Sequence, residues 1–295
     1  MEQADRVEQI ELAGAGGLRL VADVAGPPEG PQVVLLHGGG QTRHAWRGSL
    51  LALAARGWRA YSVDLRGHGD SDWAPDGDYT IDAFANDVTA VARALRRPAL
   101  VGASLGGISA LMAAGEHDPP PASALVLVDV APKLERAGTD RVGGFMRAHA
   151  ESGFASLDEV ADAIAAYNPH RPRPTDLSGL RKNVRQRADG RWVWHWDPEF
   201  LNGRLGSIDE SRTSTMRSSR LEAAARGLTV PTLLVRGRMS DILSEEGVRQ
   251  MLELAPHTKF VDVAGAGHMV AGDRNDAFND VVFSFLEDVR GGAAG

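Results

Sequence analysis

The sequence predicts an α/β fold in which a mostly parallel, doubly wound sheet carries one long, mainly helical insertion. Three observations predict it. Short apolar runs alternate with helical patterns up to residue 128 and again from residue 232, and parallel strands require such crossover helices. A serine stands at a switch from strand to helix within residues 98–107. The alternation stops over residues 133–230, where no apolar strand run occurs.

The elements of the first half follow from their residue patterns. Two alternating runs separated by a glycine-rich turn predict an opening antiparallel hairpin, and short apolar runs predict buried strands. The predicted strands are residues 7–12, 18–25, 32–36, 59–63 and 124–128. Helical periodicity runs from Trp46 until Gly57 stops it, and again over residues 80–97 with apolar residues on one face.

Residues 98–107 read Pro-Ala-Leu-Val-Gly-Ala-Ser-Leu-Gly-Gly. The strand ends at Gly102 and the helix begins just after Ser104, so the serine stands in a sharp turn with strained backbone angles. Side chains at Gly102 or Gly106 would collide there, which is the physical content of the G-x-S-x-G nucleophile elbow. The alternative is a glycine-rich connection with an incidental serine.

The second half contains the insertion and the end of the sheet. We predict a core of residues 1–132 and 231–295 and an insertion of residues 133–230 over the carboxyl edge of the sheet. Strands are predicted at residues 232–235 and 259–263, and an amphipathic helix at 277–289. Trp192, Trp194 and Trp196 would share one face of an extended segment. Such a stripe favours packing inside the insertion over the lining of a pocket.

Composition excludes several classes of function. The 295-residue chain is 43% hydrophobic, enough for a sizeable core, and carries a net charge of −7, which argues against a nucleic-acid face. It has no cysteine, so disulfides and thiol catalysis are excluded. No signal segment or membrane-length apolar run is found, so we expect a cytoplasmic protein. The partner expected is a small-molecule substrate, without cofactor or metal, and a homodimer is left open.

A serine nucleophile requires a base, and the base requires an orienting acid. His268 follows the last strand in a loop of small residues and is the predicted base. Asp241, just beyond the strand at 232–235, is the predicted acid, and the order Ser104, Asp241, His268 is that of an α/β-hydrolase triad. Asp241 also suits a helix cap. Asp129, at the end of its own strand, is the rival acid, although Asp129 also suits a turn into the insertion.

The rest of the site is predicted from the loop His37-Gly38-Gly39-Gly40. Glycines there let the backbone approach a substrate oxygen, and we expect the N–H groups of Gly39 and Leu105 to form the oxyanion hole. His37 and His68 are interpreted as structural. The residues expected to bind substrate are Gly38, Trp46, Trp192, Trp194, Met239 and Met269, with Trp46 open between packing and the wall of the pocket.

Together these motifs resemble the α/β-hydrolase superfamily over nearly the whole chain. The resemblance rests on the His37–Gly40 loop, residues 64–71, residues 102–107, Asp241 and the Gly267-His268 pair. The chain looks most like the branch of small bacterial esterases, cofactor-free haloperoxidases and epoxide hydrolase relatives. Epoxide hydrolases and haloalkane dehalogenases place Asp where this chain has Ser104, so their alkyl-ester chemistry is disfavoured. The insertion corresponds to the family's cap domain.

The function expected is that of a serine hydrolase acting on a carboxylic ester or lactone of a small to medium hydrophobic substrate. Ser104, His268 and Asp241 would form the triad, and an acyl-enzyme would be released by water. The same triad could instead carry out perhydrolysis or carbon–carbon bond hydrolysis. A receptor that keeps the fold and the pocket without catalysis is the alternative from another class.

Overall fold

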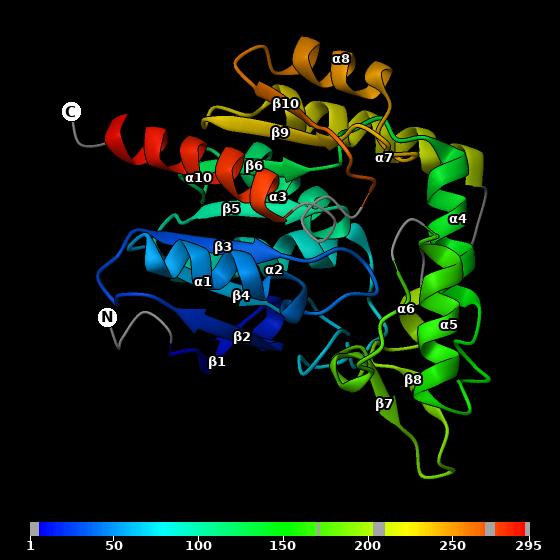
Figure 1. The fold of residues 1–295 in the computed structure, drawn as a ribbon. Helices are drawn as coiled ribbons and strands as arrows, with labels where there is room; N and C mark the ends of the chain where they lie inside the picture. The colour runs from blue at the N-terminus through cyan, green and yellow to red at the C-terminus, as the bar shows by residue number, and fades with distance from the viewer. Residues whose placement is uncertain (1–5, 170–171, 203–209, 269–274, 293–295) are drawn as a thin grey trace.

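A computed structural model describes residues 6–169, 172–202, 210–268 and 275–292, and one sheet runs through it (Figure 1). The eight strands of this sheet in the described residues lie in the order β1-β2-β4-β3-β5-β6-β9-β10. Their bounds are β1 Glu8–Ala13, β2 Arg19–Ala25, β3 Gln32–Leu36, β4 Arg59–Val63, β5 Ala99–Ala103, β6 Ala124–Val128, β9 Thr232–Gly237 and β10 Lys259–Val263. Only β1 with β2 and β2 with β4 pair antiparallel, and the other pairs are parallel. The predicted mostly parallel sheet with an opening hairpin is therefore confirmed.

Helices cover both faces of this sheet. Along β3, Val34 and Leu36 pack into one apolar cluster, while Val33 and Leu35 pack into another on the opposite face. Residues that alternate between two buried faces explain why the central strands read as continuous apolar runs. The first cluster is completed by α2 Ile81–Ala94 and α3 Leu105–Gly115, and the second by α1 Arg47–Ala55 and α10 Asn275–Gly292. The doubly wound architecture is confirmed.

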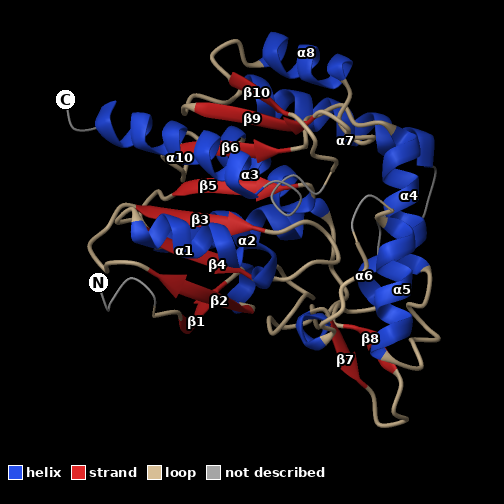
Figure 2. Cartoon of the chain, in the orientation of Figure 1, coloured by secondary structure: helices blue, strands red, loops and turns tan. Residues whose placement is uncertain are grey.

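The insertion folds beyond the arrowheads of the parallel strands (Figure 2). Its elements, with the helix that follows β9, are α4 Arg136–Arg147, α5 Leu157–Tyr167, β7 Val184–Gln186, β8 Trp192–Trp194, α6 Glu199–Asn202, α7 Glu210–Arg226 and α8 Glu245–Leu254. The hairpin of β7 and β8 was not expected, because three-residue strands are too short to leave an apolar run. The end of α7 packs on α3: a Cβ at Gly115 would come within 2.0 Å of the Ala224 carbonyl oxygen. The division of the chain into core and insertion stays a prediction.

Buried hydrogen bonds join the insertion to the core. The hydroxyl of Tyr79 donates to Oδ2 of Asp197 at 2.5 Å, and the Asp197 amide donates to the Gly67 carbonyl at 2.8 Å. The Gly69 amide donates to Nδ1 of His195 at 2.7 Å. Because these polar groups are buried, separating the two parts would expose or orphan each of them. The segment around His195 is therefore fixed to the core.

The helices described here give no sign of a membrane span. Within the described residues, none combines the length and the apolar character that crossing a bilayer requires.

Candidate active site

Ser104 lies in a strained turn between β5 and α3. Its backbone angles are φ 46° and ψ −116°, and a positive φ is costly for a residue with a side chain. A Cβ added to Gly102 would come within 2.5 Å of the Gly106 carbonyl oxygen, and one added to Gly106 within 2.5 Å of the Leu36 carbonyl oxygen. The two glycines are therefore required by space, as the sequence predicted, and the strand–turn–helix geometry of the elbow is confirmed.

The glycine-rich loop after β3 lies against this turn. A Cβ at Gly38 would be 3.4 Å from the Cβ of Ser104. The Gly38 amide donates to Oε1 of Gln41 at 3.0 Å, and the Gly40 amide donates to Nε2 of His68 at 3.1 Å. By contrast, no acceptor in the described part of the chain takes the N–H of Gly39 or Leu105. Both amides are thus available near Ser104, where the sequence placed the oxyanion hole.

His268 pairs with Asp129. Nδ1 of His268 lies 2.7 Å from Oδ2 of Asp129, whose side chain is fully buried. The same carboxylate accepts the Ser240 hydroxyl at 2.5 Å and the Gly237 amide at 3.1 Å. The Asp129 carboxylate faces Nδ1 of His268 as a hydrogen-bond acceptor, so the neutral imidazole carries its hydrogen on Nδ1. Nε2 is then the basic nitrogen of His268.

The prediction that Asp241 orients His268 is wrong in this structure. Its carboxylate accepts two hydrogen bonds from Arg141 of α4, at 2.8 Å from Nε and 3.0 Å from Nη2, and the side chain is 43% exposed. The physical reason is local. Ser240 donates its hydroxyl to Asp129 and accepts the amides of Ile242 and Leu243, so the chain turns and Asp241 faces the insertion. The rival acid, Asp129, takes the position.

Ser104 and Asp129 lie at neighbouring strand ends. In the pairing of β5 with β6, Ala103 is opposite Val128, and the Ser104 amide donates to the Val128 carbonyl at 3.3 Å. The residues that follow the two strands therefore emerge side by side at the carboxyl edge. Among the described residues, no hydrogen bond joins Ser104 to His268. Contacts of this kind often tighten only when substrate binds.

The residues expected to bind substrate have different outcomes. Trp46 is 2% exposed and packs 5.8 Å from the ring of Phe278 in the core under α10, so its predicted pocket role is wrong. A large aromatic side chain in this position fills the space between two helices. Met239 is 54% exposed. Met269 lies outside the described residues.

The tryptophans of the insertion form an aromatic cluster. Trp194 stacks on Trp196 with ring centroids 5.0 Å apart, and the edge of Phe154 meets Trp194 at 5.0 Å. Trp192 lies beneath the Arg181 guanidinium at 4.9 Å. These contacts agree with packing inside the insertion, which the alternating pattern favoured. A lining role for Trp192 and Trp194 stays a prediction.

Other side chains of the insertion reach the glycine-rich loop. A Cβ at Gly39 would lie 3.5 Å from Cζ of Phe200, and one at Gly40 would lie 2.9 Å from Cε of Met146 and 3.3 Å from Cζ3 of Trp196. Sequence reasoning did not single out these three as neighbours of the loop, because the contacts depend on how the insertion docks. These three side chains of the insertion lie over the glycine-rich loop.

Two buried imidazoles hold this part of the site. Nε2 of His37 accepts the Leu65 amide at 3.0 Å, and the rings of His37 and His68 are 5.2 Å apart. Burial lowers the pKa of His37 to about 4 and that of His68 to about 3, from 6.5. Both are therefore neutral at pH 7 and act as acceptors of backbone amides, in agreement with the structural role predicted for them.

This burial predicts an acid-sensitive fold. Below pH 6.5, His37 and His68 bind protons in the unfolded chain but stay neutral in the folded protein. The free energy of unfolding therefore falls as the pH drops toward their lowered pKa values. Each imidazole contributes at most about 1.4 kcal/mol per pH unit. Urea unfolding between about pH 7 and about pH 4.5 should give a smaller loss of stability per pH unit in His68→Asn than in wild type. His257→Asn, which keeps both buried rings, is the control, and equal slopes in all three proteins would contradict the prediction.

Possible metal ligands were compared by position. Within the described ranges, no group of three or more His, Cys, Asp or Glu side chains is placed to hold a metal ion.

The fold and the serine turn together define a class of hydrolase, and comparison with known proteins agrees. The Alpha/beta hydrolase family matches residues 33–281. Esterase Rv0045c of Mycobacterium tuberculosis is 31% identical, with 95% of this chain and 89% of the relative covered. The 3-hydroxybutyrate-oligomer hydrolase of Cupriavidus necator is 28% identical, with 91% and 93% covered. The crystal structure of E-2-(acetamidomethylene)succinate hydrolase has a TM-score of 0.80 at 24% identity, with 96% of this chain and 100% of that chain covered.

This protein belongs to the Alpha/beta hydrolase family, and the resemblance inferred from its motifs is confirmed.

Proposed function

We propose that this protein hydrolyses a carboxylic ester or lactone of a small to medium hydrophobic substrate through a Ser104–His268–Asp129 triad. The observation that carries the proposal is the 2.7 Å contact between His268 and Asp129, at the strand end beside Ser104. Acyl transfer needs a serine nucleophile and an imidazole that an acid orients, and the chain supplies both at this edge of the sheet. An esterase among the relatives supports the same class of substrate.

Each group has a defined task in this mechanism. Ser104 Oγ attacks the carbonyl carbon while Nε2 of His268 takes its proton. Asp129 holds Nδ1–H and stabilises the imidazolium that forms. The amides of Gly39 and Leu105 donate to the oxyanion of the tetrahedral intermediate. His268 then protonates the leaving alcohol and activates a water that releases the acid from the acyl-enzyme.

A fluorophosphonate probe tests the assignment directly. The probe should label the native protein at one residue, and peptide mapping should place the adduct on Ser104. A panel of p-nitrophenyl esters and aliphatic lactones would then show which carbonyl substrates turn over. Labelling elsewhere, or no turnover of any ester or lactone by a protein labelled at Ser104, would contradict the proposal and favour a ligand receptor or another reaction of the same triad.

Side chains over the glycine-rich loop are expected to set chain-length preference. Phe200 is 5% exposed and lies beside Gly39, so Phe200→Leu should open space there and shift preference toward longer acyl chains by several-fold. Phe154→Leu is the matched control, because Phe154 packs on Trp194 inside the insertion. The measurement is kcat/KM for p-nitrophenyl esters of increasing length. An unchanged profile in Phe200→Leu, or the same shift in Phe154→Leu, would show that Phe200 does not limit the pocket.

A further inference from the structure

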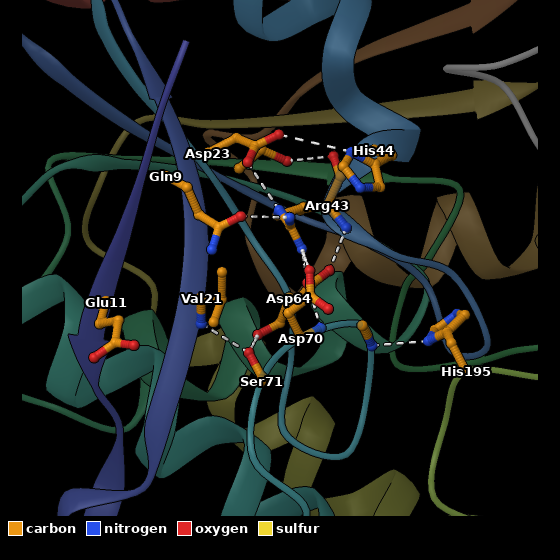
Figure 3. Close-up of polar contacts among 12 residues, drawn as sticks. Gln9, Glu11, Val21, Asp23, Arg43, His44, Asp64, Asp70, Ser71 and His195 are labelled. Atoms are coloured by element: carbon orange, nitrogen blue, oxygen red, sulfur yellow. Dashed lines mark hydrogen bonds and ion pairs between the residues drawn. The ribbon is translucent and has the colours of Figure 1, made fainter. Parts of the chain in front are cut away.

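A cavity lies between the insertion and the core. Its volume is about 320 Å³, and its walls come from residues 42–44 and 69–70 of the core and from Ser178, Arg181, Lys182, Val184, Arg185 and His195 of the insertion. Neither Ser104 nor His268 lines it. Figure 3 shows four of its residues: Arg43, His44 and Asp70 belong to one polar network, and His195 makes a separate contact.

Carboxylates outside the cavity neutralise part of the positive charge in its lining. The buried Arg43 guanidinium pairs with Asp23 at 2.8 Å and also with Asp64, and neither acid lines the cavity (Figure 3). Asp70 is the carboxylate in the lining, and it is held by Arg43 at 2.8 Å and by Arg185 at 3.3 Å. These two arginines are therefore occupied by carboxylates already present.

Arg181 and Lys182 remain without such partners. Both line the cavity, and neither side chain forms an ion pair or a hydrogen bond with a described residue. The Arg181 guanidinium lies over the ring of Trp192, at 4.9 Å from its centroid. On a chain with a net charge of −7, two adjacent unpaired cations over a recess create a local positive potential.

A buried polar atom without a partner lies in the same walls. Thr42 is 2% exposed, and its Oγ1 has no hydrogen-bond partner among the described residues. A buried donor left without an acceptor costs stability and marks a place where a ligand or water is expected.

We propose that this cavity binds a small oxyanion, the carboxylate or phosphate group of a small molecule. Arg181 and Lys182 supply the charge, and Thr42 supplies a hydroxyl donor from the floor. Guanidinium and ammonium groups are the side chains that bind carboxylates and phosphates most strongly. A volume of about 320 Å³ suits a small molecule rather than a polymer. The site does not depend on the chemistry of Ser104.

Isothermal titration with inorganic phosphate and with succinate tests the proposal. Wild type and Ser104→Ala should bind at least one of the two with equal affinity, and the affinity should fall as NaCl rises. The double variant Arg181→Gln/Lys182→Gln should lose at least about tenfold in affinity. Both side chains are exposed, so the fold should tolerate the changes. Preference for succinate or for phosphate identifies which oxyanion the site takes.

Arg187→Gln is the matched control, since Arg187 lies in the same part of the insertion, pairs with Asp189 at 2.7 Å and does not line the cavity. It should bind like wild type. No binding of either anion at about 10 mM, or equal losses in the control and the double variant, would overturn the proposal. Binding of heparin alone, with neither small anion bound, would also overturn it in favour of a polyanionic partner. Because Ser104→Ala keeps the site, failure here is separate from failure of the hydrolase assignment.

Discussion

Ser104→Ala should abolish ester turnover while the protein stays folded. The backbone of the elbow is strained at φ 46°, but Ala occupies the same backbone conformation as Ser without the nucleophile. Removing one member of a triad that acts as a unit costs at least about a thousandfold in kcat. The measurement is kcat on a p-nitrophenyl ester in the range that wild type hydrolyses best.

Ser109→Ala is the control for this substitution. Ser109 lies one helical turn along α3, is buried, and donates only to the Leu105 carbonyl at 2.7 Å. It should keep activity within a few-fold of wild type. Equal melting temperatures for Ser104→Ala and wild type would show that activity was lost without unfolding. A folded Ser104→Ala protein that keeps more than about a tenth of wild-type activity would remove Ser104 from the mechanism.

The core of the fold could be predicted from sequence because its signals are local. Continuous apolar runs such as residues 32–36 and 124–128 are what strands buried on both faces require. The elbow could be predicted partly for the same reason, since the crowding of Gly102 against Gly106 lies within a few residues of Ser104, whereas Gly106 is crowded by the Leu36 carbonyl of a neighbouring strand. The hairpin of β7 and β8 was not predicted, because its strands of three residues each are too short to leave an apolar run.

The sequence analysis favoured Asp241 over Asp129 as the acid. Each follows a strand and precedes His268 in the chain, so the chain order alone does not separate them. The choice is made by contacts distant in sequence: Ser240 donates to Asp129, and Arg141 of the insertion binds Asp241. Trp46 was misassigned for a similar reason, because its side chain packs against Phe278 at the far end of the chain.

The two candidate acids therefore predict opposite results for a pair of isosteric substitutions. Asp129→Asn should lower kcat by about a thousandfold or more, because an amide facing Nδ1 favours the wrong imidazole tautomer and does not stabilise the imidazolium. Asp241→Asn should stay within a few-fold of wild type. It removes only an ion pair with Arg141 whose partners are 46% and 43% exposed, and such pairs contribute little.

A structural role for Asp129 must be separated from its proposed role toward His268. Its carboxylate also accepts Ser240 and Gly237, so Asp129→Asn is expected to destabilise the fold somewhat. Ser240→Ala removes one of those contacts and leaves the contact with His268. Its effect on activity therefore measures what the structural contacts of Asp129 contribute. The rate of fluorophosphonate labelling at Ser104, measured against pH, supplies a second readout. If Asp129 orients the base, the labelling rate falls in Asp129→Asn far more than in Ser240→Ala at equal folded fraction. A greater loss of kcat in Asp241→Asn than in Asp129→Asn would show that Asp241, in the loop after β9, is the acid.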